Sequence, residues 1–420
     1  MNKFQISNFG PIKNLDVDLG DLTILLGPQA SGKTLFLQLA KLIVDKDYIV
    51  QNLLKYNYVI DGDSDKVLNY YFGDRLSSMW KNCTMVKVDG EAFEKCSLLN
   101  AENADAKERL FYIPAQRILS ISDGRPKNFM EFDISSPYVL RNFSETLRLF
   151  FQHGMGSENV IFPLNQRLND GMKQSFNDTI FHGGEVVIDE QAGQKKMRMK
   201  VGDTSLPFMT WSAGQKEFMP LLMAFYCLTE PMAKSINGNQ YEYVVVEEPE
   251  MGLHPRAIQS VIIQILELIK MGYKVIVSTH SPVLLEFAWT FKMLQQFPQE
   301  VREQALCELF DASLDSNVGE TVKGAVSKDV RTFYFSHTKE GVVTDDISSL
   351  DVASENMGEA EWGGLSQFAS KASEVVSKYM AEYGEDRFSI GSRANGRGVG
   401  CIRAWTSCTE KGRGWQGGGF

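Results

Sequence analysis

The alternation of hydrophobic and polar positions predicts that the chain opens with a hairpin, followed by a strand, a loop and a helix. Apolar residues alternate with polar ones over 4–9 and again over 15–19, on either side of a Gly-Pro turn. The apolar run 21–26 is typical of a buried strand, and it leads directly into a glycine-containing loop at 27–34. Leucines spaced over 35–43 predict a helix after the loop.

A second pair of strands surrounds a helix later in the chain. Residues 243–246 form an apolar run that ends in two carboxylates, and 257–271 carries apolar side chains at helical spacing. Residues 274–278 read as the next strand. Because strands alternate with helices, the pattern favours an α/β fold with a parallel sheet.

Other segments give weaker patterns. Residues 45–105 show no clear period, and 120–180 reads as an irregular insertion apart from one helix. The remaining expected elements are a strand at 110–113, a helix at 138–151, a hairpin of 185–189 with 196–201, a helix from Thr210, strands at 330–335 and 341–344, and a helix near 365–380.

Composition places the chain among globular proteins. Its 420 residues include 43% hydrophobic and 23% charged positions, which is enough apolar material for a large core. The formal charge of −10 argues against a surface covered with nucleic-acid-binding charge but leaves a local basic patch open. No apolar run approaches the length of a membrane span, and the first residues lack a secretory core. Six scattered cysteines without a C-x-x-C pair are typical of a reducing compartment, so we expect a cytoplasmic protein.

The loop at 27–34 has the pattern Gly27-x-x-x-x-Gly32-Lys33-Thr34. Glycines let backbone N–H groups curl around phosphate oxygens, and the following helix presents its positive N-terminus to them. Lys33 would reach the β- and γ-phosphates, and the Thr34 hydroxyl would bind Mg²⁺. A chance glycine turn is the alternative, but the flanking strand and helix are the context that phosphate binding requires.

Three further motifs follow strands or begin a helix. Glu247 and Glu248 end the apolar strand, where one carboxylate can organise Mg²⁺ and the next can activate water. His280 follows the next strand and can hydrogen-bond a γ-phosphate as a neutral imidazole. Ser212 and Gly214 open a helix as an N-cap and a close-approach position. An exposed acidic turn, a structural histidine and a simple capped helix are the respective alternatives.

Together, these motifs resemble the ABC-type ATPase head of the SMC/RecF/OLD class, over roughly residues 1–350. The run Glu-Glu-Pro-Glu-Met-Gly-Leu-His-Pro at 247–255 is especially similar to the RecF/OLD-like branch. The matching elements are a Walker A loop at Gly27–Thr34, a Q-loop at Gln116, a signature motif at Ser212–Gln215, a Walker B strand at Val244–Glu248, a D-loop at Pro249–Pro255 and a switch at His280.

The chain departs from that pattern at three positions. Gln29 stands where relatives usually have Asn, Ala213 replaces the first signature glycine, and Glu247 replaces the commoner Asp. At the Q-loop, the sequence leaves open whether Gln116 or the neighbouring Arg117 is the functional residue.

The resemblance implies a P-loop NTPase fold with a mixed or parallel core sheet, an antiparallel β lobe and a helical insertion at about 120–205. We expect the head to span 1–350, a C-terminal helical segment 351–390, and a flexible tail rich in Gly and Arg 391–420. Too few residues separate the Q-loop from the signature motif for a coiled coil. No acidic cluster after residue 350 indicates a TOPRIM nuclease.

The resemblance also implies that ATP is held between two heads, so the protein should act as a homodimer or higher homo-oligomer. Thr34, Gln116 and Glu247 would hold Mg²⁺, Glu248 would activate water, and His280 would contact the γ-phosphate. The nucleotide-binding residues would be Gly27, Pro28, Gln29, Ala30, Ser31, Gly32, Lys33 and Thr34 of one subunit, with Ser212, Gly214 and Gln215 of the other.

At the level of function, the resemblance favours an ATPase that gates a separate effector, a nuclease or toxin, in a bacterial anti-phage system. The alternative is a RecF-like repair ATPase that acts on DNA ends or gaps, and a third is a scaffold in which ATP only joins two copies. The basic stretch 195–200 and the tail with Trp405 and Trp415 are candidate DNA contacts. A solvated strand face and a non-functional extension are their alternatives.

Overall fold

The computed structural model describes residues 2–100, 103, 105–153, 159–164, 168, 170–191, 193–229, 241–350, 371–372 and 375–378. The chain divides into two compact units, Met1–Ser366 and Gln367–Phe420. In the second unit, 371–372 and 375–378 are helical. The rest of the helix expected near 365–380, the rest of the segment 351–390 and the tail 391–420 lie outside the described residues.

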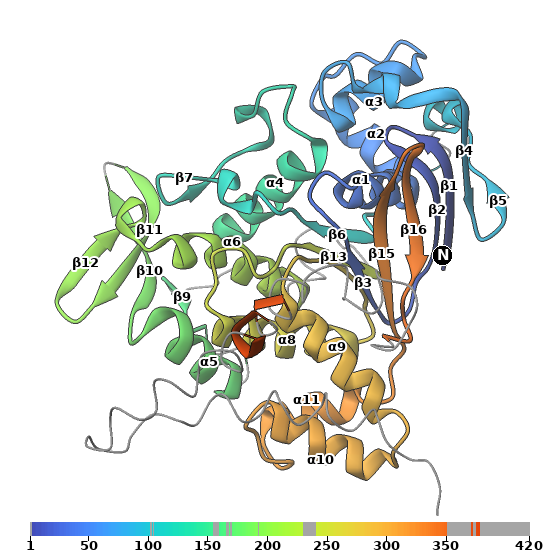
Figure 1. Ribbon diagram of the computed structural model, residues 1–420. Helices are drawn as coiled ribbons and strands as arrows, with labels where there is room; N and C mark the ends of the chain where they lie inside the picture. Colours follow the sequence, from blue (N-terminus) through green and yellow to red (C-terminus); the bar gives the residue numbers. More distant parts are fainter. Residues whose placement is uncertain are drawn as a thin grey trace, which may run out of the picture. The chain divides into compact units, whose positions relative to one another are not determined.

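A ten-stranded sheet forms the centre of the first unit (Figure 1), in the order β5-β4-β1-β2-β16-β15-β3-β14-β13-β6. The strands β15, β3, β14, β13 and β6 are parallel, whereas β2, β1, β4 and β5 pair antiparallel. The strand bounds are β1 Lys3–Phe9, β2 Ile12–Asp18, β3 Leu22–Leu26, β4 Trp80–Val88, β5 Glu91–Ala92, β6 Leu110–Ile113, β13 Tyr243–Glu247, β14 Lys274–Ser278, β15 Val330–Thr338 and β16 Gly341–Asp346.

Apolar clusters pack on both faces of the parallel strands, so the central positions of these strands are mostly apolar. Along β13, Val244 and Val246 join the apolar cluster that contains α6, α8 and α9, while Val245 joins the cluster that contains α1, α2 and α3. The helix bounds are α1 Lys33–Val44, α2 Lys46–Lys55, α3 Ser64–Phe72, α4 Tyr138–His153, α5 Asp170–Phe176, α6 Ala213–Leu228, α8 Pro255–Lys270, α9 Pro282–Leu294, α10 Gln299–Leu309 and α11 Asn317–Ala325. This arrangement confirms the expected α/β fold with a mixed core sheet.

A separate antiparallel sheet lies within the segment expected to be an insertion. It has the order β12-β11-β10-β9, with bounds β9 Val160–Phe162, β10 Glu185–Gln191, β11 Gln194–Val201 and β12 Thr204–Pro207. A two-stranded ribbon pairs β7 Ile121–Ser122 with β8 Arg125–Pro126. A π-helix at Asn177–Phe181 follows α5. Met197 and Met199 of β11 bury against the main core, which explains why this strand alternates in the sequence.

Two parts of the chain differ from the expectation. The segment 45–105, which has no clear period, contains α2, α3, β4 and β5, because its apolar positions are grouped in elements of about ten residues or fewer. The segment 282–325 forms α9, α10 and α11, none of which the sequence pattern predicted. The helix expected from Thr210 begins instead at Ala213, because Ser212 caps it by accepting a hydrogen bond from the Gln215 N–H.

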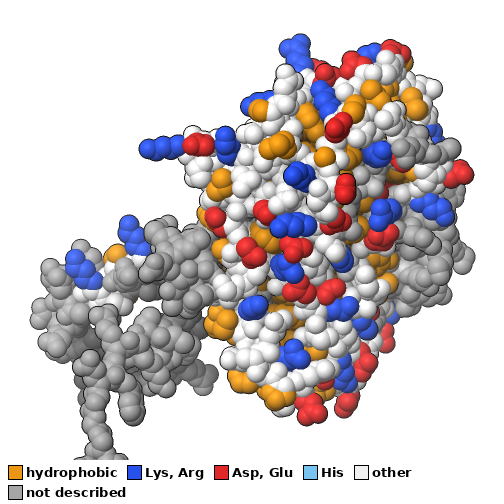
Figure 2. All heavy atoms as spheres, turned by 90° about the vertical axis from the view of Figure 1, so that its right-hand side faces the viewer, with side chains coloured by type: hydrophobic (Ala, Val, Ile, Leu, Met, Phe, Trp, Pro, Cys, Tyr) orange, Lys and Arg blue, Asp and Glu red, His pale blue; other side chains and the backbone are white. Residues whose placement is uncertain are grey.

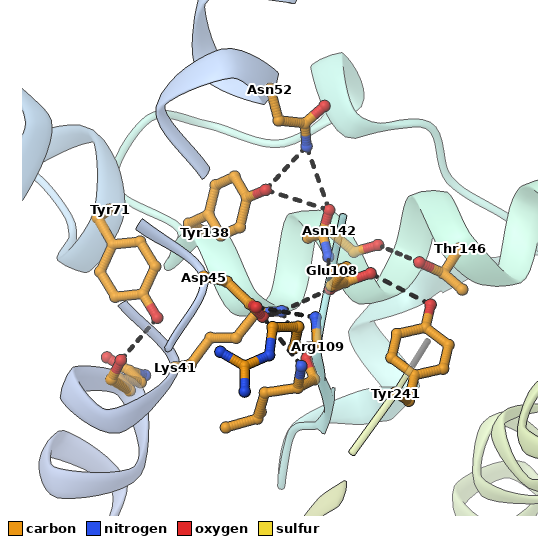
Figure 3. Close-up of polar contacts among 12 residues, drawn as sticks. Lys41, Asp45, Asn52, Tyr71, Glu108, Arg109, Tyr138, Asn142, Thr146 and Tyr241 are labelled. Carbon is orange, nitrogen blue, oxygen red and sulfur yellow. Dashed lines mark hydrogen bonds and ion pairs between the residues drawn. The ribbon is translucent and has the colours of Figure 1, made fainter. Parts of the chain in front are cut away.

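A buried charge cluster joins α1 to the edge strand β6 (Figure 3). The Lys41 ammonium lies 2.6 Å from the Asp45 carboxylate and 2.5 Å from that of Glu108, and all three side chains are buried. Asp45 accepts hydrogen bonds from the backbone N–H groups of Arg109 and Leu110. Asp45 therefore pairs two backbone donors at the start of the edge strand β6, which would otherwise be unpaired.

Candidate nucleotide-binding site

The glycine loop connects β3 to α1 in a conformation that requires its glycines. Gly27 has φ +142°, and a Cβ at this position would lie 2.5 Å from the carbonyl oxygen of Phe335. Gly32 has φ +83° and immediately precedes α1, while Ala30 has φ +60°. Any side chain larger than hydrogen at Gly27 would collide with β15, so the loop depends on that glycine for its close packing.

Lys33 is folded back onto the loop. Its ammonium donates to the carbonyl oxygens of Gly27 at 2.7 Å and Pro28 at 2.9 Å, and to Ser31 Oγ at 3.2 Å. Burial lowers the pKa of Lys33 to about 8, and the nearby carboxylates, Glu248 first among them, oppose this shift. The loop therefore holds a desolvated cation beside the N-terminus of α1, an arrangement suited to an anion.

A cavity of about 320 Å³ opens above the loop. The loop and the first turns of α1 contribute most of its lining, and two side chains arrive from distant strands. Glu248 comes from the end of β13, and His280 follows the end of β14. The lining residues are Gln29, Ala30, Ser31, Gly32, Lys33, Thr34, Leu35, Gln38, Glu248 and His280. Because β3, β14 and β13 are parallel neighbours, their carboxyl ends bring three separate motifs to one site.

Glu247 lies beneath the cavity rather than in its lining. Its Oε2 accepts from the Ala115 N–H at 3.2 Å, and its Oε1 is buried with no hydrogen-bond partner among the described residues. Burial raises the pKa of Glu247, and the neighbouring Thr34 hydroxyl opposes that rise. An unpartnered carboxylate oxygen beside a hydroxyl is the donor set that Mg²⁺ prefers, so these two residues fit a magnesium ion.

Glu248 and His280 face each other across the cavity. Glu248 Oε1 lies 3.7 Å from His280 Nε2, and both side chains are about one-third exposed. Burial, together with the charge of Lys33, lowers the pKa of His280. Both effects favour the neutral imidazole, which is the form expected to hydrogen-bond a γ-phosphate.

The sequence did not single out Glu250, which connects the D-loop to the histidine. Its Oε1 accepts from the Thr279 hydroxyl and from the His280 N–H, each at 2.7 Å. The carboxylate thus fixes the backbone that carries the imidazole. Glu250 lies two residues after Glu248, within the conspicuous 247–255 run. This position was a signal in the sequence that could have identified Glu250.

The structure separates Gln116 from Arg117. Gln116 is exposed and lies outside the cavity lining, while its neighbour Ala115 donates its backbone N–H to Glu247. Arg117 is fully buried, and its guanidinium donates to backbone carbonyls at the end of β13. In this conformation Arg117 cannot contact a phosphate directly, because its side chain is buried in the protein.

The signature residues also lie outside this cavity. Ser212 is exposed, and its hydroxyl and backbone form a capping box with Gln215. Gln215 also donates to the carbonyl oxygen of Ile180, in the π-helix, at 3.1 Å. A Cβ on Gly214 would lie 2.7 Å from the carbonyl oxygen of Gly252. The signature helix therefore packs directly on the D-loop.

The basic stretch 195–200 is balanced by acidic partners. On the hairpin β10–β11, Glu190, Asp189 and Glu185 lie opposite Lys195, Lys196 and Lys200 in the strand register. Lys196 forms an ion pair with Asp123, and Arg198 lies 3.8 Å from Asp189. On another face, Figure 2 shows Lys and Arg side chains interspersed with Asp and Glu, without a continuous basic stripe among the described residues drawn there. These surfaces favour ordinary solvation over a phosphate-binding track.

The described part of the chain shows neither a membrane-spanning helix nor a metal-binding cluster. None of its helices is long and apolar enough to cross a membrane. It also holds no group of three or more His, Cys, Asp or Glu side chains arranged to bind a metal ion. A magnesium ion at Thr34 and Glu247 would accordingly depend on phosphate oxygens and water for its remaining ligands.

Part of the chain is similar to a known protein family. Residues 108–286 match the model described as "AAA domain, putative AbiEii toxin, Type IV TA system". The match runs from the start of the Q-loop region to beyond His280 and covers less than half of the chain. No curated protein sequence matches the chain.

Solved structures with a similar fold include three SMC heads. A head bound to the C-winged helix domain of ScpA is 11% identical, with TM-score 0.38, over 82% of this chain and 96% of that one. The head from Thermotoga maritima is 10% identical, with TM-score 0.34, over 82% and 98%. A head from Pyrococcus furiosus with an extended coiled coil, bound to the C-terminal domain of ScpA, is 9% identical, with TM-score 0.35, over 82% and 95%.

Fold and site together are those of a P-loop domain. Its α/β sheet carries the glycine loop between β3 and α1, and the chain after β13 and β14 reaches the cavity above that loop. Residues 108–286, which are similar to the AAA domain model, include Glu247, Glu248 and His280.

Proposed function

We propose that the protein binds ATP with Mg²⁺ and hydrolyses it at a site that two copies of the chain complete together. The observation that carries this proposal is the cavity at which Lys33, Glu248 and His280 meet although they lie far apart in the sequence. Ser212 and Gly214 lie outside that cavity, close to the chain's own D-loop. In a sandwich of two heads, they are free to contact the nucleotide of the other copy.

Each residue has a role that follows from its position. Lys33 exchanges the carbonyls of Gly27 and Pro28 for the β- and γ-phosphates. Thr34 and Glu247 hold Mg²⁺, which neutralises charge on the phosphate oxygens when it is bound. The Glu248 carboxylate orients the attacking water and accepts its proton, while the neutral His280 donates a hydrogen bond to the γ-phosphate.

Steady-state ATP turnover by three variants tests this proposal. Lys33→Ala should abolish nucleotide binding, and Glu248→Gln should keep binding while lowering turnover by about 100-fold or more. Lys66→Ala is a matched control because Lys66 makes only an exposed ion pair with Asp61. Turnover that survives Lys33→Ala would overturn the proposal, and binding without any wild-type turnover would favour the scaffold in which ATP only joins two copies.

For the biological role, we infer that the ATPase gates a separate effector, a nuclease or toxin, in a bacterial anti-phage system. The family description, with its putative toxin and toxin–antitoxin system, supports a role in such a pair. Two experiments test this role. The protein should co-purify with a second polypeptide, and toxicity or nuclease activity should require both chains and an intact Lys33. The role would be contradicted if bacterial growth and phage infection were the same with and without the two chains.

A DNA-repair ATPase of RecF-like type is the second candidate. The acidic residues opposite the lysines of β11, the ion pairs of Lys196 and Arg198, and the mixed charges of Figure 2 make it the weaker one. DNA-stimulated turnover that falls steeply with salt would favour it over effector gating.

A further inference from the structure

Arg117 is a buried cation whose acceptors are all backbone carbonyls. It lies in the short 3₁₀ helix Arg117–Ser120 that follows β6, and its side chain is fully buried. Its Nη1 donates to the carbonyl oxygens of Glu247 at 3.1 Å and Glu248 at 3.2 Å, and its Nη2 donates to that of Glu248 at 3.2 Å. Two of its three nitrogens therefore hold the backbone at the end of the Walker B strand.

The backbone that Arg117 holds is strained. Glu248 has φ +43°, a left-handed conformation that costs free energy for a residue with a side chain. Its N–H donates to the carbonyl oxygen of Ser278 at 2.8 Å. The direction of the Glu248 carboxylate thus depends on two backbone anchors, Ser278 on the N–H side and Arg117 on the carbonyl side.

The third nitrogen of Arg117 contacts the signature helix. Its Nε donates to the carbonyl oxygen of Glu217, in α6, at 3.1 Å. The same helix packs Gly214 against Gly252 of the D-loop. One guanidinium therefore connects α6 to the residue placed to activate water.

We propose that Arg117 is a positioning residue that sets the direction of the Glu248 carboxylate and ties it to the signature helix of the same chain. The inference rests on the proposed hydrolysis of ATP. It also answers the question that the sequence left open at Gln116 and Arg117. The exposed Gln116 has no comparable anchor to the Walker B strand.

The kinetic test compares Arg117→Lys and Arg117→Gln with the wild-type chain. Because a small misplacement of a reacting group is costly, Arg117→Gln should lower kcat by about 100-fold while KM for ATP stays within about threefold. Arg117→Lys keeps the charge but has only one donor group, so its kcat should lie between that of the wild type and that of Arg117→Gln. Arg109→Gln is the matched control, since Arg109 immediately precedes β6, forms a half-exposed ion pair with Glu242 and should leave kcat unchanged.

A second readout separates positioning from general loss of stability. With ATP, the Arg117 variants should accumulate the same engaged dimer as Glu248→Gln, because binding is intact and hydrolysis is slow. A destabilised head would instead lose the dimer, and that result would overturn the proposal. An Arg117→Lys chain that fails to fold would also overturn it, because the guanidinium would then serve the fold.

The two proposals fail in distinguishable ways. A wild-type chain that neither binds nor hydrolyses ATP removes the proposed function and the positioning role with it. A wild-type chain that hydrolyses ATP, with Arg117→Lys and Arg117→Gln turning over equally fast, removes the positioning role alone.

Discussion

At the scale of single residues, Lys33 shows how the loop prepares for a phosphate group before one is bound. Its ammonium is satisfied by the carbonyls of Gly27 and Pro28, so its burial costs less than that of an unpaired charge. Desolvation nevertheless lowers its pKa to about 8, and a bound polyphosphate should raise it again. Nucleotide binding and protonation of Lys33 are therefore linked.

We predict that affinity for ATP falls as the pH rises above about 8. Below this value Lys33 is already protonated, whereas above it binding must take up a proton, so affinity should drop by up to about tenfold per pH unit. Calorimetry at several pH values, in buffers with different ionisation heats, measures both the affinity and the proton uptake. An affinity that stays constant between about pH 7 and about pH 9.5 would contradict the linkage.

At the scale of elements, the buried cluster of Lys41, Asp45 and Glu108 fixes the phosphate-loop helix to the edge of the sheet. Burial raises the pKa of Glu108 and the charge of Asp45 adds to that rise, while Lys41 opposes it. Asn142 and Tyr241 donate hydrogen bonds to the same carboxylate (Figure 3). One ammonium therefore compensates two buried carboxylates.

We predict that Lys41→Met destabilises the fold by about 3–5 kcal/mol, because it leaves buried charge uncompensated. Urea unfolding monitored by circular dichroism measures the change in the free energy of unfolding. Lys323→Met is the control, since Lys323 makes an exposed ion pair with Glu320, and it should unfold as the wild type does. Equal stability of the two variants would show that the cluster does not hold α1 in place.

The contact between α6 and the D-loop gives a second prediction at this scale. Gly214→Ala places a methyl group 2.7 Å from the carbonyl oxygen of Gly252, so the two elements must separate, at a cost of about 1–3 kcal/mol. If the signature helix completes the partner's site, ATP-driven dimerisation should weaken by about ten- to hundredfold while binding of ATP to one chain persists. Lys66→Ala is the control, because Lys66 makes an exposed ion pair with Asp61 away from this contact. Unchanged dimerisation by Gly214→Ala would contradict the role of this contact.

The sequence predicted the elements that carry motifs better than the elements that connect them. The strands β3, β13 and β14 each contain an apolar run, and the chemistry at their ends follows from parallel pairing. The helices α10 and α11 are short, and glycines interrupt α11, so their few apolar positions gave a weak pattern.

Two features of the site had no signal in the sequence. Lys41 and Glu108 lie 67 positions apart, and nothing in either neighbourhood indicates that they meet. The acceptors of Arg117 are backbone carbonyls, which any residue supplies, so only the three-dimensional structure identifies them.

At the scale of the whole molecule, one chain supplies only half of the proposed ATP-hydrolysing site. The phosphate loop, Glu248 and His280 line the cavity, whereas Ser212 and Gly214, at the start of the signature helix, do not. A single head can then bind ATP, but hydrolysis should require a second head. Turnover per chain should therefore rise with protein concentration.

Sedimentation velocity of the Glu248→Gln chain, with ATP and then with ADP, tests this account most directly. The account predicts a dimer or larger assembly with ATP and Mg²⁺, because the nucleotide joins two heads and is not consumed, and it predicts dissociation with ADP. A chain that binds ATP yet sediments as a monomer at every concentration would contradict the shared site.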